Sequence, residues 1–308
     1  MATERKSFLP NKSQLISGAL GGPFVIYACT PLRNGLTLGS QDRASSARML
    51  YRKVFRGGPA AGWTGGFAPS VVACPQFLAL GPIFHTIHKT LREVTGAPDG
   101  QHRMLPAWCA ATCSGLCETF LTFGSQSRNA QMAYNNSFVA FSSLEEGARS
   151  MVPLNKTSQI WGVGALPMLI RNALSAGSVR ALSPWFQQRV DIPTLGPALK
   201  ASLCDISSSI CMCVFTAPVS QLFNFMVTTP HAKTLPRQER WGLARDFLYR
   251  QYFEPLDRPD PLLPQKYSWK VSKTAARDFG MRTVYITSVF SIYMAIERTI
   301  CGALAKTA

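Results

Sequence analysis

Uncharged, largely apolar stretches dominate this chain of 308 residues. The longest of them occupy residues 13–32, 57–88 and 206–232. Each is long enough to cross the hydrocarbon core of a bilayer as a helix, which takes about 20 apolar residues. Apolar runs interrupted by scattered charges lie near residues 104–127, 158–188 and 269–298. The pattern therefore predicts an all-α membrane protein with six tilted transmembrane helices, whose outer faces meet lipid and whose inner faces line a polar space.

Basic residues alternate with apolar ones between these stretches. In residues 42–56, Arg52 and Lys53 stand between Leu50 and Val54. Basic amphipathic helices of this kind lie along a membrane surface. We expect comparable helices at residues 138–151 and 237–252. The chain thus predicts, three times over, a spanning helix, a short surface helix and a second spanning helix.

An octapeptide that occurs twice supports the threefold division. Residues 36–43 read LTLGSQDR and residues 121–128 read LTFGSQSR, so six of the eight positions are identical at a distance of 85 residues. A fainter third copy begins at Pro218, which corresponds to Pro31. Self-similarity at a fixed period indicates a repeated structural unit. We therefore interpret residues 1–308 as one membrane domain of three repeats, approximately 10–95, 103–190 and 197–302.

Composition narrows the classes of function. Charged residues make up 16% of the chain, against about 25% in typical soluble domains, and the net charge is +16. Nucleic-acid-binding proteins are also basic, but no basic cluster interleaved with aromatic residues stands out, and we expect no nucleic-acid partner. No paired carboxylates, no nucleophile beside a base and no metal-ligand spacing stand out either. We therefore expect no enzymatic activity, no metal and no cofactor.

Proline and glycine motifs carry a resemblance to a known family. Pro31 and Pro218 fall late in predicted odd-numbered helices, and Gly-x-x-Pro openings occupy residues 66–69 and 164–167. Together with the three-unit plan and the basic surface helices, these motifs resemble the mitochondrial carrier family over about residues 10–302. The resemblance implies six tilted helices in a threefold pseudo-symmetric barrel. It also implies that both termini face the intermembrane space and that the surface helices lie in the matrix.

The chain departs from that family at its gates. Odd-numbered helices of carriers usually hold Pro-x-acid-x-x-base, and these charges pair between repeats to close the matrix side. Here the acid positions hold Arg33, Glu118 and Ser220, and all three base positions hold apolar residues. The outer motif of the even-numbered helices lacks its acid as well. The sequence therefore predicts that the ion pairs with which a carrier opens and closes are missing.

Arg33 and Glu118 occupy equivalent, inward-facing positions of neighbouring repeats. A buried charge without a partner is costly. We therefore expect Arg33 and Glu118 to form an ion pair that joins the first and third spanning helices.

Arginines within the apolar segments are candidate contacts for a solute. Arg171 stands where carriers often place a solute-contacting arginine, and Arg277 or Arg282 would serve in the third repeat. An arginine in a membrane interior points to function, and its planar fork suits a carboxylate or phosphate. The alternative is an internal structural pair with Asp205 or Asp278. The sequence leaves both interpretations open.

Two functions follow from these patterns. The loss of both gates favours a structural or accessory subunit of a larger assembly in the mitochondrial inner membrane, with the outer membrane as a second location. Its expected partners are other subunits of that assembly and the lipid bilayer, including cardiolipin at the surface helices. The proline-rich residues 253–264 favour the same function, because such connections often serve as binding arms. The alternative is an active anion transporter with a non-standard gate.

Overall fold

The computed structural model describes residues 12–96, 104–141, 151–190, 196–255 and 269–307. This part of the chain is largely α-helical, which confirms the all-α prediction. The helices are α1 (Lys12–Ala28), α2 (Thr30–Gln41), α3 (Ala47–Val54), α4 (Phe67–Val94), α5 (Met104–Phe141), α6 (Ala165–Gly177), α7 (Ser183–Arg189), α8 (Pro197–Thr228), α9 (Arg237–Tyr252) and α10 (Lys273–Thr307). Shorter elements are the helical turns η1 (Pro59–Trp63), η2 (Ser178–Leu182) and η3 (Pro230–Lys233) and the strands β1 (Phe253–Pro255) and β2 (Trp269–Val271).

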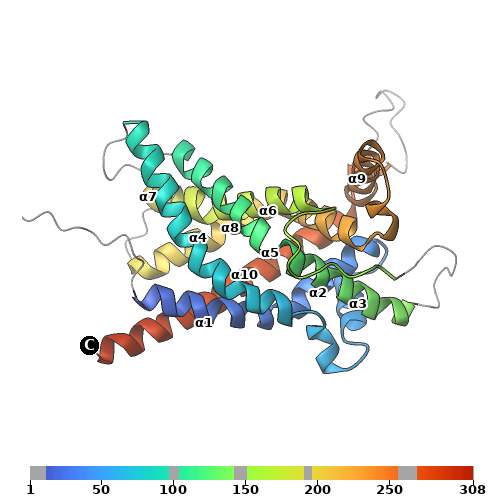
Figure 1. Cartoon of the computed structure of the whole chain (residues 1–308), viewed down its shortest axis with the longest axis horizontal. Coiled ribbons are helices and arrows are strands. Elements are labelled where there is room, and N and C mark those ends of the chain that lie inside the picture. The colour runs from blue at the N-terminus through green and yellow to red at the C-terminus, as the bar shows by residue number, and fades with distance from the viewer. Residues whose placement is uncertain (1–11, 97–103, 142–150, 191–195, 256–268, 308) are drawn as a thin grey trace, which may run out of the picture.

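The long helices of the described chain form a closed ring. Neighbours in the order α1, α4, α5, α6, α8 and α10 pack against each other, and α10 closes the ring against α1 (Figure 1). The short helix α2 follows α1 and contacts α5, α8 and α10. By length and composition, α4 and residues Leu199–Thr228 of α8 are apolar enough to cross a membrane. The chain is thus folded so that one face of each ring helix points to a common interior.

Glycines stand at the turns that lead into α4 and α6. Gly66 directly precedes α4 and Gly164 directly precedes α6, so both Gly-x-x-Pro motifs open a helix. A Cβ on Gly66 would lie 2.5 Å from Oγ1 of Thr30, and one on Gly164 would lie 2.8 Å from Cγ1 of Val227. Gly164 also has a φ of 90°, which side chains rarely tolerate. Close approach to a neighbouring helix therefore explains glycine at both turns.

The two prolines of the repeat act differently. The helical path is interrupted at Cys29, and Pro31 lies in the first turn of α2. Proline has no N–H to donate, and the first turn is where a helix needs none. In α8, by contrast, the helix continues through Pro218. Pro31 therefore lies at the start of a new helix and not late in a single one, whereas Pro218 lies late in α8 as predicted.

α3, η1 and α9 lie at one end of the ring, which we call the loop end (Figure 1). α3 falls within the predicted surface segment 42–56, and α9 has the predicted bounds. Leu50 and Val54 of α3, however, are buried in a hydrophobic cluster with Met281 of α10. An amphipathic pattern arises equally from packing on protein. Leu50 and Val54 therefore pack on the ring, whereas Met49 of the same helix is half exposed.

The second predicted surface helix, at residues 138–151, lies mostly outside the described residues, while α5 itself continues through Phe141. After α9 the chain enters β1, which pairs with β2 in antiparallel register, Phe253 opposite Val271. The sequence pattern does not predict these strands. The proline-rich residues 256–264 between them lie outside the described part of the chain.

Candidate functional site in the central cavity

A cavity of about 370 Å³ lies inside the ring of helices. Residues of α1, α2, α4, α5, α6, η2, α8 and α10 line it. Ligand pockets in proteins measure about 300–1,000 Å³. The cavity is therefore large enough to hold a small organic molecule, and we treat its lining as the candidate functional site.

The three predicted gate positions meet at this cavity. Arg33 of α2, Glu118 of α5 and Ser220 of α8 all line it, although they come from distant parts of the sequence. The octapeptide and proline alignments place these residues at equivalent points of the chain. The three aligned positions therefore face one cavity.

The predicted ion pair between Arg33 and Glu118 is wrong. Glu118 instead accepts a hydrogen bond from Nε2 of Gln76 at 3.0 Å. The buried Nε and Nη2 atoms of Arg33 have no hydrogen-bond partner among the described residues. The charges that act on Glu118 are those of Arg171 and Arg282. Equivalent positions in two repeats face the same cavity, but this alone does not bring two side chains into contact across it.

Arg171 lines the cavity and is held by neutral groups. Its Nη2 donates to Oε1 of Gln126 at 2.9 Å and to Oδ1 of Asn172 at 2.8 Å. Its guanidinium carbon lies 5.3 Å from the centre of the Phe223 ring. These neutral contacts fix the side chain, and the proposed pairing of Arg171 with Asp205 is not found. The carboxylate of Glu118 offsets part of the Arg171 charge. A guanidinium positioned in this way is suited to bind an anion.

Arg282 also lines the cavity and is only 6% exposed. Its guanidinium carbon lies 5.3 Å from the centre of the Tyr285 ring, and its buried Nε has no hydrogen-bond partner among the described residues. Buried polar atoms in proteins are rarely left without a partner. Arg282 therefore offers a donor that the described protein groups do not use.

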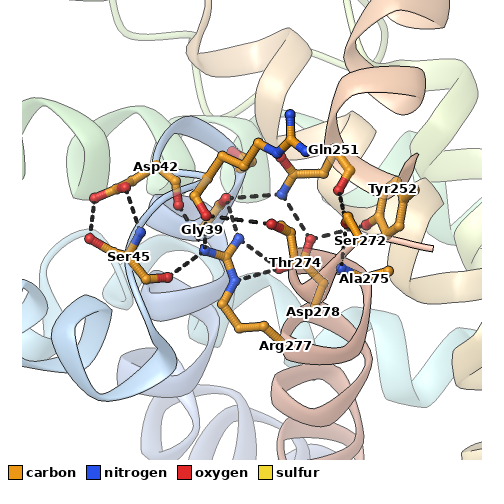
Figure 2. A network of polar contacts seen from close by, with 12 residues as sticks. Gly39, Asp42, Ser45, Gln251, Tyr252, Ser272, Thr274, Ala275, Arg277 and Asp278 are labelled. Carbon is orange, nitrogen blue, oxygen red and sulfur yellow. Dashed lines mark hydrogen bonds and ion pairs between the residues drawn. The ribbon is translucent and has the colours of Figure 1, made fainter. Parts of the chain in front are cut away.

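The third candidate, Arg277, does not line the cavity. Figure 2 shows it at the loop end, where it donates to the backbone carbonyls of Gly39, Asp42 and Ser45 at 2.8, 2.8 and 2.7 Å. It also forms an ion pair with the buried Asp278 at 2.9 Å. The last carbonyls of a helix lack partners within the helix. Arg277 donates to these carbonyls at the end of α2. Of the two interpretations that the sequence leaves open for Arg277, the structure therefore shows the internal pair with Asp278.

The same network continues around Asp278 and Asp42. Asp278 accepts hydrogen bonds from Nε2 of Gln251 at 2.9 Å and from the hydroxyl of Tyr252 at 3.2 Å, which ties α9 to α10 (Figure 2). Asp42 accepts hydrogen bonds from Lys53 and Ser45. Burial alone would raise the pKa of the Asp42 carboxyl, but these hydrogen bonds and the Lys53 charge lower it below its usual range.

Arg180 is a cavity residue that the sequence analysis does not single out. It lies in η2, a π-helical turn, and three consecutive residues, Ser178, Val179 and Arg180, line the cavity. Successive residues of a regular helix point in directions about 100° apart, and π-turns inside helices often occur at functional sites. The Arg180 guanidinium carbon lies 5.2 Å from the centre of the Phe84 ring. A lone arginine within an apolar segment is the sequence signal that could have found it.

Neutral hydrogen bonds join α2, α5 and α8 near the loop end. Nδ2 of Asn129 on α5 donates to Oδ1 of Asn34 on α2 at 3.2 Å. Nε2 of Gln131 on α5 donates to the carbonyl of Val227 on α8 at 3.1 Å. Both donors are at most 1% exposed. These bonds link α5 to both of the other helices.

A third bond completes the set. Nε2 of Gln41 at the end of α2 donates to Oγ1 of Thr228 at the end of α8, at 2.7 Å. Each of the three helices is therefore bonded to the other two through amide and hydroxyl groups. No ion pair among the described residues joins α2, α5 and α8 to one another. Nothing in the sequence pattern singles out these residues, because amide side chains have no fixed partner type.

The charge of the cavity lining is strongly unequal. The lining contains the arginines at positions 33, 171, 180 and 282 and a single carboxylate, Glu118. No ion pair within the described chain neutralises any of the four arginines. The cavity can therefore attract and hold an anion. In comparisons with known proteins, no protein-family model matches this chain, and no curated protein matches it at a significant level.

Proposed function

We propose that this chain is a divergent carrier-type protein of the mitochondrial inner membrane, with six tilted spans in three related repeats. Three observations support the proposal. The helices pack in a closed cyclic order, the Gly-x-x-Pro motifs open α4 and α6, and residues 33, 118 and 220 meet at one cavity. Exposed apolar side chains on α1 and α8, such as Leu20, Phe24 and Phe215, suit contact with lipid.

The function proposed for it is that of a structural or accessory subunit of a larger inner-membrane assembly. The observation that carries this proposal is the set of neutral hydrogen bonds among α2, α5 and α8. A carrier rocks between two states by making and breaking charged pairs at each end. Buried amide bonds contribute about 0.5–1.5 kcal/mol each and offer no alternative partner in a second state. The barrel is thereby held in one conformation.

Its partners, in this proposal, are other subunits of that assembly and the surrounding bilayer, including cardiolipin at the loop end. α9 presents exposed cations to such a surface, among them Arg237 and Arg250. Cationic side chains near a membrane surface attract anionic lipid by about 1 kcal/mol each.

The decisive experiment is extraction of mitochondrial membranes in a mild detergent, followed by separation of intact complexes and quantification of this chain. We expect stoichiometric recovery with one large assembly. Liposomes that contain the purified protein should show no saturable exchange of dicarboxylates, phosphate or amino acids. Recovery as a monomer together with saturable exchange would overturn the proposal.

A second candidate function is anion transport. It is favoured by the four arginines of the cavity, because a purely structural barrel has no need of uncompensated charge in its interior. In this case the liposomes would take up an anion, and Arg171→Ala would abolish uptake. The matched control is Arg245→Ala on the exposed face of α9, which should leave uptake unchanged.

A further inference from the structure

The cavity joins a basic floor to two unlike walls, one apolar and one rich in hydroxyl groups. From this arrangement we propose that it binds an amphiphilic organic anion, in which an acidic group is attached to an aromatic or branched apolar body. The inference rests on the proposed function only in placing the ring in a membrane. It holds whether the barrel is fixed in one conformation or moves its ligand across the bilayer.

The floor lies toward the loop end and carries the binding groups for the acid. Arg33, Arg171 and Arg282 come from α2, α6 and α10, so they surround the floor from three sides. Among the described residues, buried nitrogens of Arg33 and Arg282 have no hydrogen-bond partner, and the buried hydroxyl of Ser220 in the same lining has none either. Buried donors of this kind call for an acceptor. A carboxylate or phosphate oxygen is the acceptor that guanidinium groups bind most strongly.

The apolar wall is formed by α4 and α10. Phe77, Leu80 and Phe84 contribute from α4, and Ile286 and Val289 contribute from α10. The ring centres of Phe77 and Tyr293 lie 5.4 Å apart in a stacked arrangement, which makes the wall continuous between the two helices. Apolar area of this kind binds an apolar group through the hydrophobic effect. It adds nothing to the binding of inorganic phosphate or a short dicarboxylate.

The opposite wall is formed by α5, α6 and α8. It carries the hydroxyl groups of Ser114, Ser175, Ser209 and Thr216 beside apolar side chains such as Met212. Hydroxyl groups can both donate and accept a hydrogen bond, so they accommodate water or a polar substituent beside the apolar body. The ligand is therefore expected to lie with its apolar side against α4 and α10.

The length of the cavity sets the length of the ligand. Phe84 stands eight residues beyond Gln76, the partner of Glu118 on the floor. At about 1.5 Å per helical residue, these two levels are separated by roughly 12 Å. Arg180 and Phe84 stand together at the far level. An acid on the floor with a body of four to six carbon–carbon bonds, or about 5–8 Å, would extend along the wall without reaching Arg180.

The test uses the full-length protein in a nonionic detergent, with phenylbutyrate as the probe. Binding is measured by isothermal titration calorimetry and by the ligand-dependent rise of the unfolding temperature, which follows from mass action. Three matched compounds serve as controls: butyrate lacks the apolar body, phenylbutylamine reverses the charge, and succinate replaces the body by a second acid. We expect saturable binding of phenylbutyrate that is at least tenfold tighter than that of any control.

Variants place the binding within the cavity. Arg171→Gln and Arg282→Gln should each weaken phenylbutyrate binding at least tenfold, whereas Arg282→Lys, which keeps the charge, should restore part of it. Val289→Thr should weaken phenylbutyrate severalfold and leave butyrate unchanged, because it makes only the wall more polar. Arg245→Gln, an exposed arginine on α9, is the control and should have no effect.

Each other outcome overturns the inference. If butyrate or succinate bound as tightly as phenylbutyrate, the apolar body would not be required for binding. If phenylbutylamine bound as tightly, the acidic group would not be required. Absence of saturable binding, or binding that all the cavity variants retain, would show that the cavity is not the site. These results are separate from recovery of the chain in an assembly and from exchange in liposomes. Either proposal can therefore fail while the other stands.

Discussion

The two copies of the octapeptide have nearly the same residues, and their serine and threonine hydroxyls at two equivalent positions form the same hydrogen bonds. The hydroxyl of Ser40 donates to the carbonyl of Thr37 at 2.7 Å, and that of Ser125 donates to the carbonyl of Thr122 at 3.0 Å. Each threonine in turn donates to the carbonyl four residues before it. At these two positions, equal sequence gives equal local structure.

Beyond these bonds the first copy marks the end of a helix. α2 ends at Gln41, and Asp42 follows as its cap. The carbonyl of Gly39 accepts hydrogen bonds from Arg277 at 2.8 Å and from Gln251 at 3.3 Å. These donors come from α9 and α10, more than 200 residues further along the chain. Partners from the third repeat thus stabilise the end of a helix in the first.

The second copy lies in the interior of a helix. α5 continues beyond it to Phe141, and the chain before α6 passes over its surface. The Nδ2 atom of Asn155 donates to the hydroxyl of Ser127 at 2.8 Å, and a Cβ on Gly124 would overlap the carbonyl oxygen of Thr157. The difference teaches that this octapeptide is compatible with both a helix end and a helix interior. Contacts with distant segments select between them.

The largest expected effect is at Arg277, a partner that only the first copy has. Arg277→Gln should lower the free energy of unfolding by about 3–5 kcal/mol, because it leaves the buried Asp278 carboxylate without its ion pair. The matched variant Arg128→Gln removes one hydrogen bond to the carbonyl of Asn155 and should cost about 1 kcal/mol. Unfolding in detergent by denaturant measures both. Adding Asp278→Asn to Arg277→Gln should recover part of the loss, and equal losses at the two arginines would contradict the comparison.

The same substitution at the equivalent glycines should have unequal effects. Gly124→Ala should destabilise the fold by about 1–3 kcal/mol, because backbone carbonyls of residues 156–159 stand too close to a Cβ. Gly39→Ala should be neutral or stabilising by up to about 1 kcal/mol, since its nearest neighbour would lie at an ordinary 3.4 Å and alanine favours a helix. The thermal unfolding midpoint of each variant, compared with that of the unchanged protein, measures both effects. A greater loss at Gly39 would show that the contacts of the two copies have been assigned the wrong way round.

Substitutions of the equivalent glutamines, Gln41 and Gln126, should differ in the segment whose amide hydrogen exchange they change. Gln41→Met breaks the bond to Thr228 and should cost about 0.5–1.5 kcal/mol, with faster amide hydrogen exchange at the end of α8. Gln126→Met breaks the bond to Arg171 inside the cavity and should leave that exchange unchanged. Exchange followed by mass spectrometry resolves the two segments. Unchanged exchange in both variants would remove the support for a fixed loop end.

The smallest expected effect is a difference between the two copies in how local stability depends on pH. The pKa of Asp42 is lowered in the folded protein, so its contribution to stability is complete above the ordinary carboxyl pKa and is lost as the pH falls through the folded value. Amide exchange at residues 43–46 should therefore rise more steeply in acid than exchange at residues 128–131. Ser127 takes the place of the aspartate in the second copy and does not titrate there. Asp42→Asn should abolish the difference, and a difference that persists would exclude Asp42 as its cause.

Hydrophobic pattern and repeat together predict the broad outline of this fold well. They identify the helical segments, the openings of α4 and α6 after Gly66 and Gly164, and the meeting of residues 33, 118 and 220 at one cavity. They do not predict that Leu50 and Val54 of α3 pack on protein, because an amphipathic helix has the same pattern whether it packs on protein or on lipid. The hydrophobic pattern and the repeat do not predict the strands β1 and β2, because each strand is only three residues long.

For the candidate site, too, the sequence predicts which side chains face inward but not which groups they contact. A repeat tells which positions are equivalent and therefore which side chains face inward, so Arg171, Arg282 and the gate positions are found from the chain alone. It cannot assign Glu118 to Gln76 rather than to Arg33, or Arg277 to the end of α2 rather than to the cavity. Periodicity acts over neighbouring residues of one helix, whereas a hydrogen bond is satisfied only by a group within about 3 Å. Which group stands there depends on how the other helices are packed.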